Sequence, residues 1–483
     1  FFDLTMAKVV VATFLLVALA LGLVLGWHHG EVPRQSFMMV TTRSVAGPQA
    51  IGTTQRARFV RYYDAASPSF TSNSAAQQSR ASVLPRMHAT SESDIGDTSK
   101  EIIICGAGII GASIAYYLTL KGFKPTVVER KEVAAAAGGK GGGFLAGGWG
   151  YGVTEQLHTK SFELHEELAR ELDLKSYRKI PTISVCAGSR PNPSKVCSWL
   201  DGNIATSRLM DPNTAQVTPK EYTTALMNAA IEKGAKLVIG KVEGMETVEG
   251  TDGARKVRAV VVDGEEMPAD KVVIAMGPWS VFATDWLDLP VPMQGIWSTS
   301  VVYNHAGAQR SNEQPTAMFC EEDGNGCHLE VYPRPNGEVY LCGIGGSKYM
   351  DPAQLKELAP EDIVPDPKRV AAAHRSFSNM TTVGRDVDGP GLAQACMRPC
   401  LTDALPMMGQ VPDTDNAYIA CGHNCWGILW APISGLAMAE LIADGECTSV
   451  DLYPFRPERF GRLKARPGAR GRAQGTAEVG EQW

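Results

Sequence analysis

The sequence predicts an α/β fold in which a domain built on a parallel sheet alternates along the chain with a domain built on an antiparallel sheet. The first observation is the apolar run "EIIIC" at 101–105, which leads directly into "GAGIIG" and then into an apolar helical pattern. The second is a strand, turn and helix pattern at 416–445, far along the chain. The third is a set of short β-like runs between these segments, at 182–188, 295–303 and 327–346, which are typical of antiparallel strands.

Length and composition narrow the class of protein. With 483 residues the chain is long enough for two folded domains, which average roughly 100–200 residues each. The net charge of −6 argues against a nucleic-acid-binding protein, which normally carries a basic surface. The eleven cysteines are scattered, and no histidine pair at ligand spacing accompanies the Cys-x3-Cys pairs 396/400 and 421/425. We therefore expect neither a disulfide scaffold nor a metal site.

The two ends of the chain differ in composition from its middle. Residues 9–27 are an uninterrupted apolar run, and about 20 apolar residues suffice to cross a membrane. Residues 28–90 are rich in Ser, Thr, Ala and Arg, a composition that does not bury a core. We expect a hydrophobic anchor or signal segment at 1–30, a disordered linker or transit-like segment at 31–99, and a basic disordered tail at 461–483. The protein would then be membrane-anchored or organelle-targeted, to a plastid or the endomembrane system, with a soluble folded part.

The segment from 101 to 130 predicts a dinucleotide-binding site. Gly106 allows a tight turn, Gly108 lets backbone approach a pyrophosphate, and Gly111 lets the helix pack closely on the strand. The helix N-terminus, at Ile109 and Ile110, supplies N–H groups to the phosphates. A GxGxxG motif alone is weak evidence, but here a strand precedes it and a helix follows it.

The next strand, "KPTVVER", adds an acidic residue in the expected place. It ends at Glu129, with Arg130 beside it. The Glu129 carboxylate would accept hydrogen bonds from the ribose hydroxyls of the adenosine half. No second GxGxxG stands between a strand and a helix, so one dinucleotide is expected. The segment 416–445 is not needed for NAD, but it is needed to hold the ring of a long flavin.

At these residues the chain resembles the FAD-dependent oxidoreductases of the D-amino-acid oxidase family, which includes glycine oxidase and the sarcosine and pipecolate oxidases. The resemblance covers roughly 101–460, and "AAAAGGKGGGFLAGGW" at 134–149 is most similar to a poorly characterised eukaryotic branch. It implies an FAD-binding Rossmann-like domain of the glutathione-reductase type, made of 101–180, 212–290 and 390–460. It also implies an interleaved antiparallel β-sheet substrate domain, made of 181–211 and 291–389.

The resemblance further implies which residues hold FAD. These residues lie on the segments that return to the cofactor. In the last of these segments, backbone N–H groups meet the flavin edge that gains negative charge on reduction. The residues are Lys140 and Gly141 along the flavin, Val242 at the adenine, Gly277 and Trp279 beside the cofactor, and Gly422, His423, Gly427 and Ile428 at the N1–C2=O edge. A hydrogen-bonded structural histidine is the alternative for His423, and a solvated loop lysine is the alternative for Lys140.

The stretch "ACMRPCLTDALP" at 395–406 carries the substrate side of the resemblance. Arg398-Pro399 matches the Arg-Pro with which glycine and D-amino-acid oxidases hold the substrate carboxylate, so Arg398 is the candidate catalytic residue. A structural salt bridge is its alternative. Cys396 matches the cysteine to which sarcosine oxidases attach flavin covalently, and packing is its alternative. Further pocket candidates, from strands that present alternate residues to one face, are His328, Glu330, Tyr332 and Trp297.

The expected reaction is hydride transfer from a C–H next to nitrogen to flavin N5, which gives an imine that water hydrolyses. The substrate would be a small amine or amino acid, and oxygen or another acceptor would take the electrons. The usual basic residue of a Pro-x-Arg/Lys-Gly segment is absent at 292–295, which reads Pro-Met-Gln-Gly. Two alternatives stay open: a dehydrogenase that passes electrons to a membrane or protein acceptor, and an FAD-stabilised interaction or trafficking protein with little turnover.

Overall fold

The computed structural model describes residues 97–250, 253–304 and 308–461. These residues fall within one compact unit, 79–483. The segments predicted at 1–30, 31–99 and 461–483 lie outside the described residues, apart from a few residues at their edges.

The first sheet has six strands in the order β17-β18-β10-β1-β2-β6. All neighbours are parallel except β17, which runs antiparallel to β18. The strands are β1 (Ile102–Cys105), β2 (Thr126–Glu129), β6 (Lys236–Ile239), β10 (Lys271–Ile274), β17 (Met407–Gln410) and β18 (Ala417–Cys421). Because both faces of β1 are covered, its four residues are all buried and all apolar, as in the predicted run.

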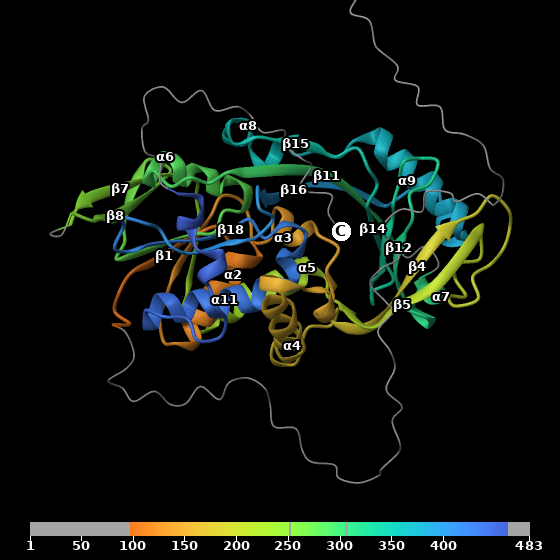
Figure 1. Cartoon of the computed structure of the whole chain (residues 1–483), viewed down its shortest axis with the longest axis horizontal. Coiled ribbons are helices and arrows are strands. Elements are labelled where there is room, and N and C mark those ends of the chain that lie inside the picture. Colours follow the sequence, from red (N-terminus) through yellow and green to blue (C-terminus); the bar gives the residue numbers. More distant parts are fainter. Residues whose placement is uncertain (1–96, 251–252, 305–307, 462–483) are drawn as a thin grey trace, which may run out of the picture. The chain divides into compact units, whose positions relative to one another are not determined.

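Helices cover one face of this sheet and a small sheet covers the other (Figure 1). The helices are α2 (Ile109–Leu120), α4 (Glu155–Glu171), α5 (Pro219–Glu232) and α11 (Gly427–Asp444). The small antiparallel sheet consists of β7 (Val242–Glu249), β8 (Arg255–Val262) and β9 (Glu265–Pro268). The predicted nucleotide-binding unit is thus a layered α/β domain.

The second sheet has nine strands and is antiparallel except between β12 and β4. Its order is β15-β11-β14-β13-β12-β4-β5-β3, and β16 joins it by pairing with β11 over ten residue pairs. The strands are β3 (Phe144–Leu145), β4 (Arg178–Ala187), β5 (Ile204–Gln216), β11 (Met293–Tyr303), β12 (Ala317–Cys320), β13 (Glu330–Pro333), β14 (Val339–Cys342), β15 (Lys348–Met350) and β16 (Leu392–Leu401). The predicted Pro-Asn-Gly turn joins β13 to β14, and its Gly337 has φ +89°, which glycine adopts at little cost.

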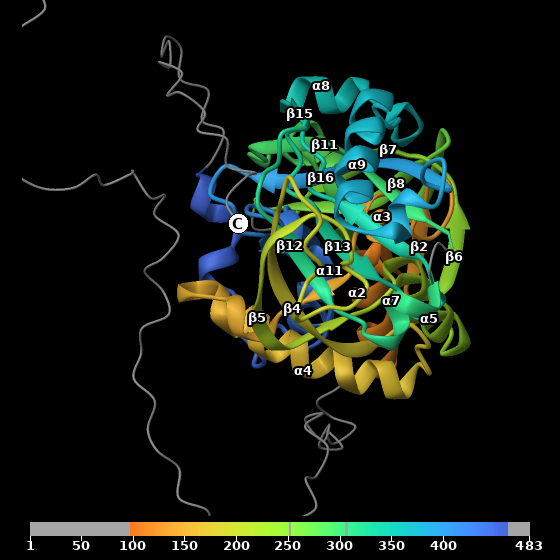
Figure 2. The same cartoon turned by 90° about the vertical axis from the view of Figure 1, so that its right-hand side faces the viewer.

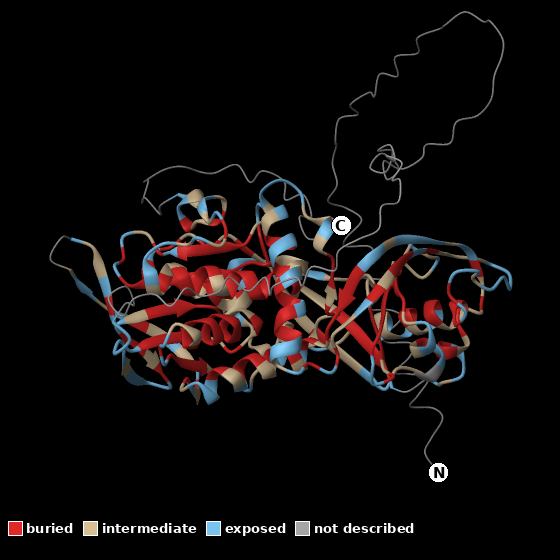
Figure 3. Cartoon of the chain, turned by 90° about the horizontal axis from the view of Figure 1, so that it is seen from below, coloured by how far each residue is buried: buried red, intermediate tan, exposed pale blue. Residues whose placement is uncertain are grey.

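One face of the second sheet packs on α9 (Pro367–Met380). This packing is visible where α9 lies beside β11 and β16 in Figure 2. The remaining short helices are α3 (Ala137–Lys140), α6 (Ala283–Leu287), α7 (Ala308–Glu313), α8 (Pro352–Glu357) and α10 (Thr382–Arg385). Buried residues run through the strands of both sheets (Figure 3).

Strand β16 crosses the domain boundary drawn from the sequence. It lies within 390–460, the segment assigned to the FAD-binding domain, yet it pairs with β11 of the second sheet. Cys400 also forms an isolated bridge with His423, which follows β18 of the first sheet. The strand that carries Arg398 therefore connects the two sheets.

Candidate active site

The turn after β1 has the geometry of a phosphate cradle. Gly106 has φ +105°, and a Cβ there would lie 2.6 Å from the Ala275 carbonyl oxygen. A Cβ on Gly111 would lie 1.9 Å from the Gly106 carbonyl oxygen, so only glycine lets α2 start this close to β1. At Gly108, by contrast, a Cβ would meet nothing within 4 Å. The space beside Gly108 is thus open, and the first-turn N–H groups of α2, at Ile109 and Ile110, have no acceptor within the helix.

Glu129 stands beside this turn, as predicted for a ribose-binding carboxylate. Its Oε2 accepts a hydrogen bond from the Ala107 N–H at 2.9 Å, and its Oε1 accepts one from the Lys131 N–H at 3.1 Å. Burial raises the pKa of this carboxyl, and the backbone hydrogen bonds oppose the rise.

Val242 lies at the same end of the sheet as Glu129, because it follows three residues after Ile239, the register partner of Glu129. The Arg130 guanidinium instead pairs with Glu361 at 3.2 Å.

The glycine-rich segment runs between the cradle and the second sheet. A Cβ on Gly138 would lie 2.7 Å from the Ile109 nitrogen, and a Cβ on Gly142 would lie 2.6 Å from the Tyr332 ring. A Cβ on Gly141 would approach Ile428 Cγ1 at 3.6 Å, which brings together two residues assigned to the flavin. The absence of side chains at these glycines keeps the segment close to both domains.

Lys140 forms hydrogen bonds through both its side chain and its backbone carbonyl. Its Nζ donates to the Ala395 carbonyl oxygen at 3.1 Å. Its own carbonyl oxygen accepts from the Tyr340 hydroxyl at 3.1 Å and from Gln394 Nε2 at 3.0 Å. These contacts do not match the alternative of a solvated loop lysine, because they hold Lys140 against β16.

The turn between β18 and α11 places the other predicted flavin residues. Gly422 has φ +76°, and Gly427 begins α11. The His423 ring is 2% exposed and its Nε2 lies 3.1 Å from the Ser434 hydroxyl. Burial lowers the pKa of His423 to about 3, so the ring is neutral. The side chain of His423 therefore matches the hydrogen-bonded structural alternative, while its backbone stands in the turn.

A second approach to the cofactor comes at the end of β10. Gly277 has φ +54°, and a Cβ there would meet nothing within 4 Å. Trp279 Nε1 donates to the Leu358 carbonyl oxygen at 2.7 Å, which fixes the indole beside the turn. Open space at Gly108 and Gly277, the free first turn of α2 and the Glu129 carboxylate together fit a bound dinucleotide.

Strand register decides which side chains accompany Arg398. In the β11–β16 pairing Ser298 is opposite Cys396 and Ile296 is opposite Arg398. Cys396 and Arg398 therefore share one face, and Ala395 and Met397 point into the core on the other. We call the face that carries Cys396 and Arg398 the functional face.

Trp297 lies on the other face of β11. It is paired with Met397, its Nε1 donates to the Val364 carbonyl oxygen at 2.9 Å, and Lys348 Nζ lies 4.6 Å from its ring centroid. Trp297, one of the pocket candidates, therefore does not share a face with Arg398. The apolar residues of β11 alternate too weakly in the sequence to reveal this face.

The functional face continues across β14, β13 and β12. Val302 of β11 is opposite Tyr340, and register then links Tyr340 to Tyr332, Cys342 to Glu330, and Glu330 to Phe319. Because the Tyr332 ring abuts Gly142, this face looks toward the glycine-rich segment. Glu330 and Tyr332, two of the pocket candidates, thus lie on the same face as Arg398, and His328 lies near enough to act on the Glu330 carboxyl by lowering its pKa.

Electrostatics link the members of this face. Burial raises the pKa of the Cys396 thiol, and the charges of Arg398 and Lys140 act in the opposite direction. Arg398 acts likewise on the thiols of Cys342 and Cys425, whose pKa values desolvation also raises. All eleven cysteines are free thiols. The sequence marked 421/425 only as spacing and did not indicate that Cys425 lies near Arg398.

An aromatic cluster, absent from the predicted site, adjoins Glu330. Phe144 stacks on Tyr332 with ring centroids 5.5 Å apart, and Trp149 lies 5.3 Å from Phe319. Trp426, in the turn before α11, lies 6.4 Å from Trp149. The signal in the sequence is the pair of aromatic residues inside "GGGFLAGGW".

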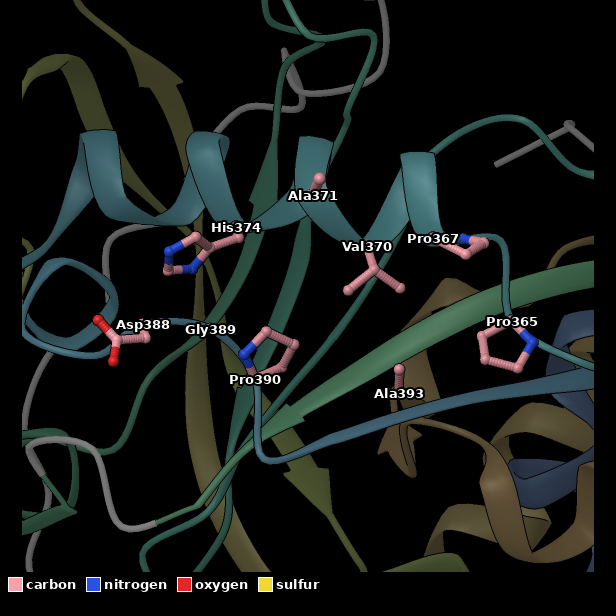
Figure 4. A pocket seen from close by; sticks show the side chains of 9 residues that line it. All are labelled: Pro365, Pro367, Val370, Ala371, His374, Asp388, Gly389, Pro390 and Ala393. Atoms are coloured by element: carbon pink, nitrogen blue, oxygen red, sulfur yellow. The ribbon is translucent and has the colours of Figure 1, made fainter. Parts of the chain in front are cut away.

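A hollow of about 380 Å³ opens elsewhere, between α9 and the start of β16 (Figure 4). Val370, His374, Pro390 and Ala393 are among its lining residues. Ala393 alternates with Gln394 and Cys396 along β16, so the hollow lies on the opposite face from Arg398.

Within the described ranges no group of His, Cys, Asp and Glu side chains is arranged to hold a metal ion.

One helix in the described part of the chain, Asn424–Asp444, is long and apolar enough to cross a membrane. Its most apolar window is 67% buried inside the protein, as expected of a core helix. The run at 9–27 lies outside the described residues.

Comparisons with known proteins agree with this geometry. A family model described as FAD dependent oxidoreductase matches residues 101–441. A protein of Schizosaccharomyces pombe, described only as an oxidoreductase, is 28% identical over 393 residues, which cover 74% of this chain and 98% of that protein. Glycine oxidase of Pseudomonas aeruginosa is 24% identical over 411 residues, which cover 76% of this chain and 100% of the enzyme.

Solved structures share the fold. Glycine oxidase from Geobacillus kaustophilus matches with a TM-score of 0.60 at 19% identity, over 74% of this chain and 98% of that one. L-amino acid deaminase from Proteus myxofaciens matches with a TM-score of 0.61 at 18% identity, over 75% and 94% of the two chains. Since the family model spans the nucleotide cradle, the glycine-rich segment and the strand of Arg398, the chain belongs to the DAO family of FAD dependent oxidoreductases.

Proposed function

We propose that this oxidoreductase oxidises a small amine or amino acid at the carbon next to nitrogen. Relatives named glycine oxidase and fold neighbours named for amino acids support this substrate class. When bound, FAD would supply the hydride acceptor, at N5 of its ring. The observation that carries the proposal is the place of Arg398, on the functional face that looks toward the glycine-rich segment.

The chain's own residues have separable roles in this proposal. The α2 N-terminus and Glu129 hold the adenosine diphosphate half of the cofactor, and the segments at Lys140, Gly277 and Gly427 hold the ring. Arg398 binds the substrate carboxylate with a planar fork of N–H donors, which orients the substrate as well as attracting it. Orientation of this kind lowers a barrier by several kcal/mol, within a ceiling of about 7–11 kcal/mol.

Oxygen or another acceptor then takes the electrons. Lys140, held 3.1 Å from the Ala395 carbonyl oxygen, is a cation on the functional side of β16. Lys140 is the candidate to supply the positive charge that the Pro-Met-Gln-Gly segment at 292–295 lacks. Reoxidation by oxygen, compared with reoxidation by a quinone, separates an oxidase from a dehydrogenase.

The test is anaerobic reduction of the purified, FAD-containing protein by a panel of amines and amino acids. We expect members of the panel to bleach the flavin absorbance, and Arg398→Lys to slow the bleaching by carboxylate-bearing members most. If the whole panel leaves the spectrum unchanged, the proposed activity is refuted, and an FAD-stabilised interaction protein with little turnover becomes the better explanation.

We also propose that the segment 1–30 anchors the chain to a membrane or targets it to an organelle. Its apolar run of 19 residues, 9–27, supports the proposal. Fractionation of cells that express the full chain, or the chain without residues 1–99, tests it. Equal distribution of both forms between soluble and membrane fractions would contradict it.

A further inference from the structure

Glu330 is a carboxylate enclosed among apolar and thiol side chains. It is 6% exposed, and its register partners on the two neighbouring strands are Phe319 and Cys342. Burying an ionisable group in such surroundings is costly unless it is paired or hydrogen-bonded. The position therefore calls for a partner that offsets the cost.

One of its two oxygens has partners. Glu330 Oε2 accepts from the Tyr332 hydroxyl and from Cys342 Sγ, the latter at 3.4 Å. These donors fix the orientation of the carboxyl plane from the same side of the sheet. Oε1 is buried and has no hydrogen-bond partner within the part of the chain that the structure describes.

The orphan oxygen lies in the candidate active site. Glu330 shares the functional face with Arg398, which is close enough to lower the pKa of the Glu330 carboxyl against the larger, raising effect of burial. The same two charged side chains act on the Cys425 thiol, in the turn that leads into α11. Strands β14 and β11 separate β13 from β16, and the charge of Arg398 acts on Glu330 across these strands.

We propose that Glu330 Oε1 accepts a hydrogen bond from the amino group of the substrate whose carboxylate Arg398 binds. The substrate is then an amino acid bound as a zwitterion, with its negative end on Arg398 and its positive end on Glu330. This inference rests on the proposed function and narrows its substrate class from amines and amino acids to amino acids.

The surroundings support this charge arrangement. A substrate ammonium is the kind of donor that a buried carboxylate lacks, and hydrogen bonds between charged groups are about twice as strong as neutral ones. Phe319 is the register partner of Glu330, and Tyr332 donates to its carboxylate. Their rings cluster with that of Phe144, with centroids 5.1–6.2 Å from one another, and aromatic faces attract cations. The same rings favour an apolar side chain on the amino acid.

The test measures binding without turnover. α-Methylalanine and α-methylphenylglycine are amino acids that carry no hydrogen on the carbon next to nitrogen, so that carbon has no hydride to give. Isobutyrate and α-methylphenylacetate are their amine-free counterparts. Each probe is titrated into the FAD-containing protein, and the change in flavin absorbance gives its Kd.

In the wild type we expect the amino probes to bind at least about tenfold more tightly than their counterparts, the effect of one hydrogen bond to a charged group. Glu330→Gln should abolish this preference and leave the Kd of the amine-free probes unchanged or lower. Arg398→Lys should weaken all four probes. Glu265→Gln, a carboxylate exposed on β9, is the matched control and should bind as the wild type does.

Several outcomes overturn the proposal. They are an amine-free probe that binds the wild type as tightly as its amino counterpart, a preference that survives in Glu330→Gln, and failure of all four probes to bind. Because the first comparison uses the wild type alone, a lack of preference there overturns the proposal even if Glu330→Gln loses FAD or stability. Absence of flavin bleaching by any oxidisable amine or amino acid would instead refute the proposed function, since these probes report binding only.

Discussion

Replacement of Gly108 by alanine should separate FAD binding from folding. The backbone at Gly108 has φ −70° and ψ 179°, an extended conformation that alanine adopts without strain. A Cβ at this position would meet no protein atom within 4 Å. We therefore expect the free energy of unfolding of the cofactor-free protein to change by less than about 1 kcal/mol.

The effect on FAD affinity should be larger. If the pyrophosphate lies against Gly108, the added methyl group occupies the space where backbone and phosphate meet. Overpacking of a close contact costs about 1–3 kcal/mol. That range corresponds to an increase of roughly 5- to 150-fold in the Kd for FAD.

Two further variants give the comparison its meaning. In Gly111→Ala the Cβ would lie 1.9 Å from the Gly106 carbonyl oxygen, so both stability and FAD content should fall. In Gly324→Ala the Cβ also meets nothing within 4 Å, but the residue lies in a turn between β12 and β13, so neither quantity should change. Fluorescence titration of the cofactor-free proteins with FAD gives Kd, and urea unfolding gives stability. A Gly108→Ala protein with wild-type FAD affinity would show that the pyrophosphate does not lie at this turn.

Three other predictions concern the rest of the site. Burial lowers the pKa of His423 to about 3 and of His165 to about 4, so the unfolded chain, with histidine pKa values near 6.5, binds more protons between pH 6.5 and 4. Each histidine should lower the free energy of unfolding by about 1.4 kcal/mol for each pH unit by which pH falls through that window. His423→Gln should reduce the slope of the free energy of unfolding in urea, plotted against pH, by that amount. Arg398→Lys should weaken binding of simple carboxylates by roughly tenfold or more at unchanged FAD content, and equal binding would refute the arginine clamp. Because burial raises the pKa of the Cys396 thiol, the acid pellet of the denatured protein should be colourless with FAD in the supernatant; a yellow pellet that Cys396→Ala bleaches would show covalent attachment instead.

The nucleotide cradle was predictable because its requirements are local. Gly106, Gly108 and Gly111 lie within six residues, and the structure shows a steric reason for glycine at Gly106 and at Gly111. Glu129 is one strand away and accepts from the turn itself at 2.9 Å. A motif of this kind needs no knowledge of distant contacts.

The substrate side was predictable only in part, because it depends on register between distant strands. Arg398 and Glu330 meet through β11 and β14, and a one-residue shift in pairing would turn either side chain to the opposite face. Trp297 shows the consequence, since its neighbour Ile296 shares the functional face and Trp297 does not. The sequence of β11 has apolar residues on both faces and so carries only a weak signal for the choice.

The cofactor and substrate sides of the site are built on shared pieces of chain. Gly138 lies against the first turn of α2. Two residues later, Lys140 forms hydrogen bonds to β16 through its Nζ and its carbonyl oxygen, and to β14 through its carbonyl oxygen. Lys140 contacts Gln394 and Ala395 of β16, which are followed directly by Cys396 and, two residues later, by Arg398. A shift of the glycine-rich segment away from α2 would therefore move the support of the carboxylate-binding strand. It follows that loss of FAD should weaken carboxylate binding.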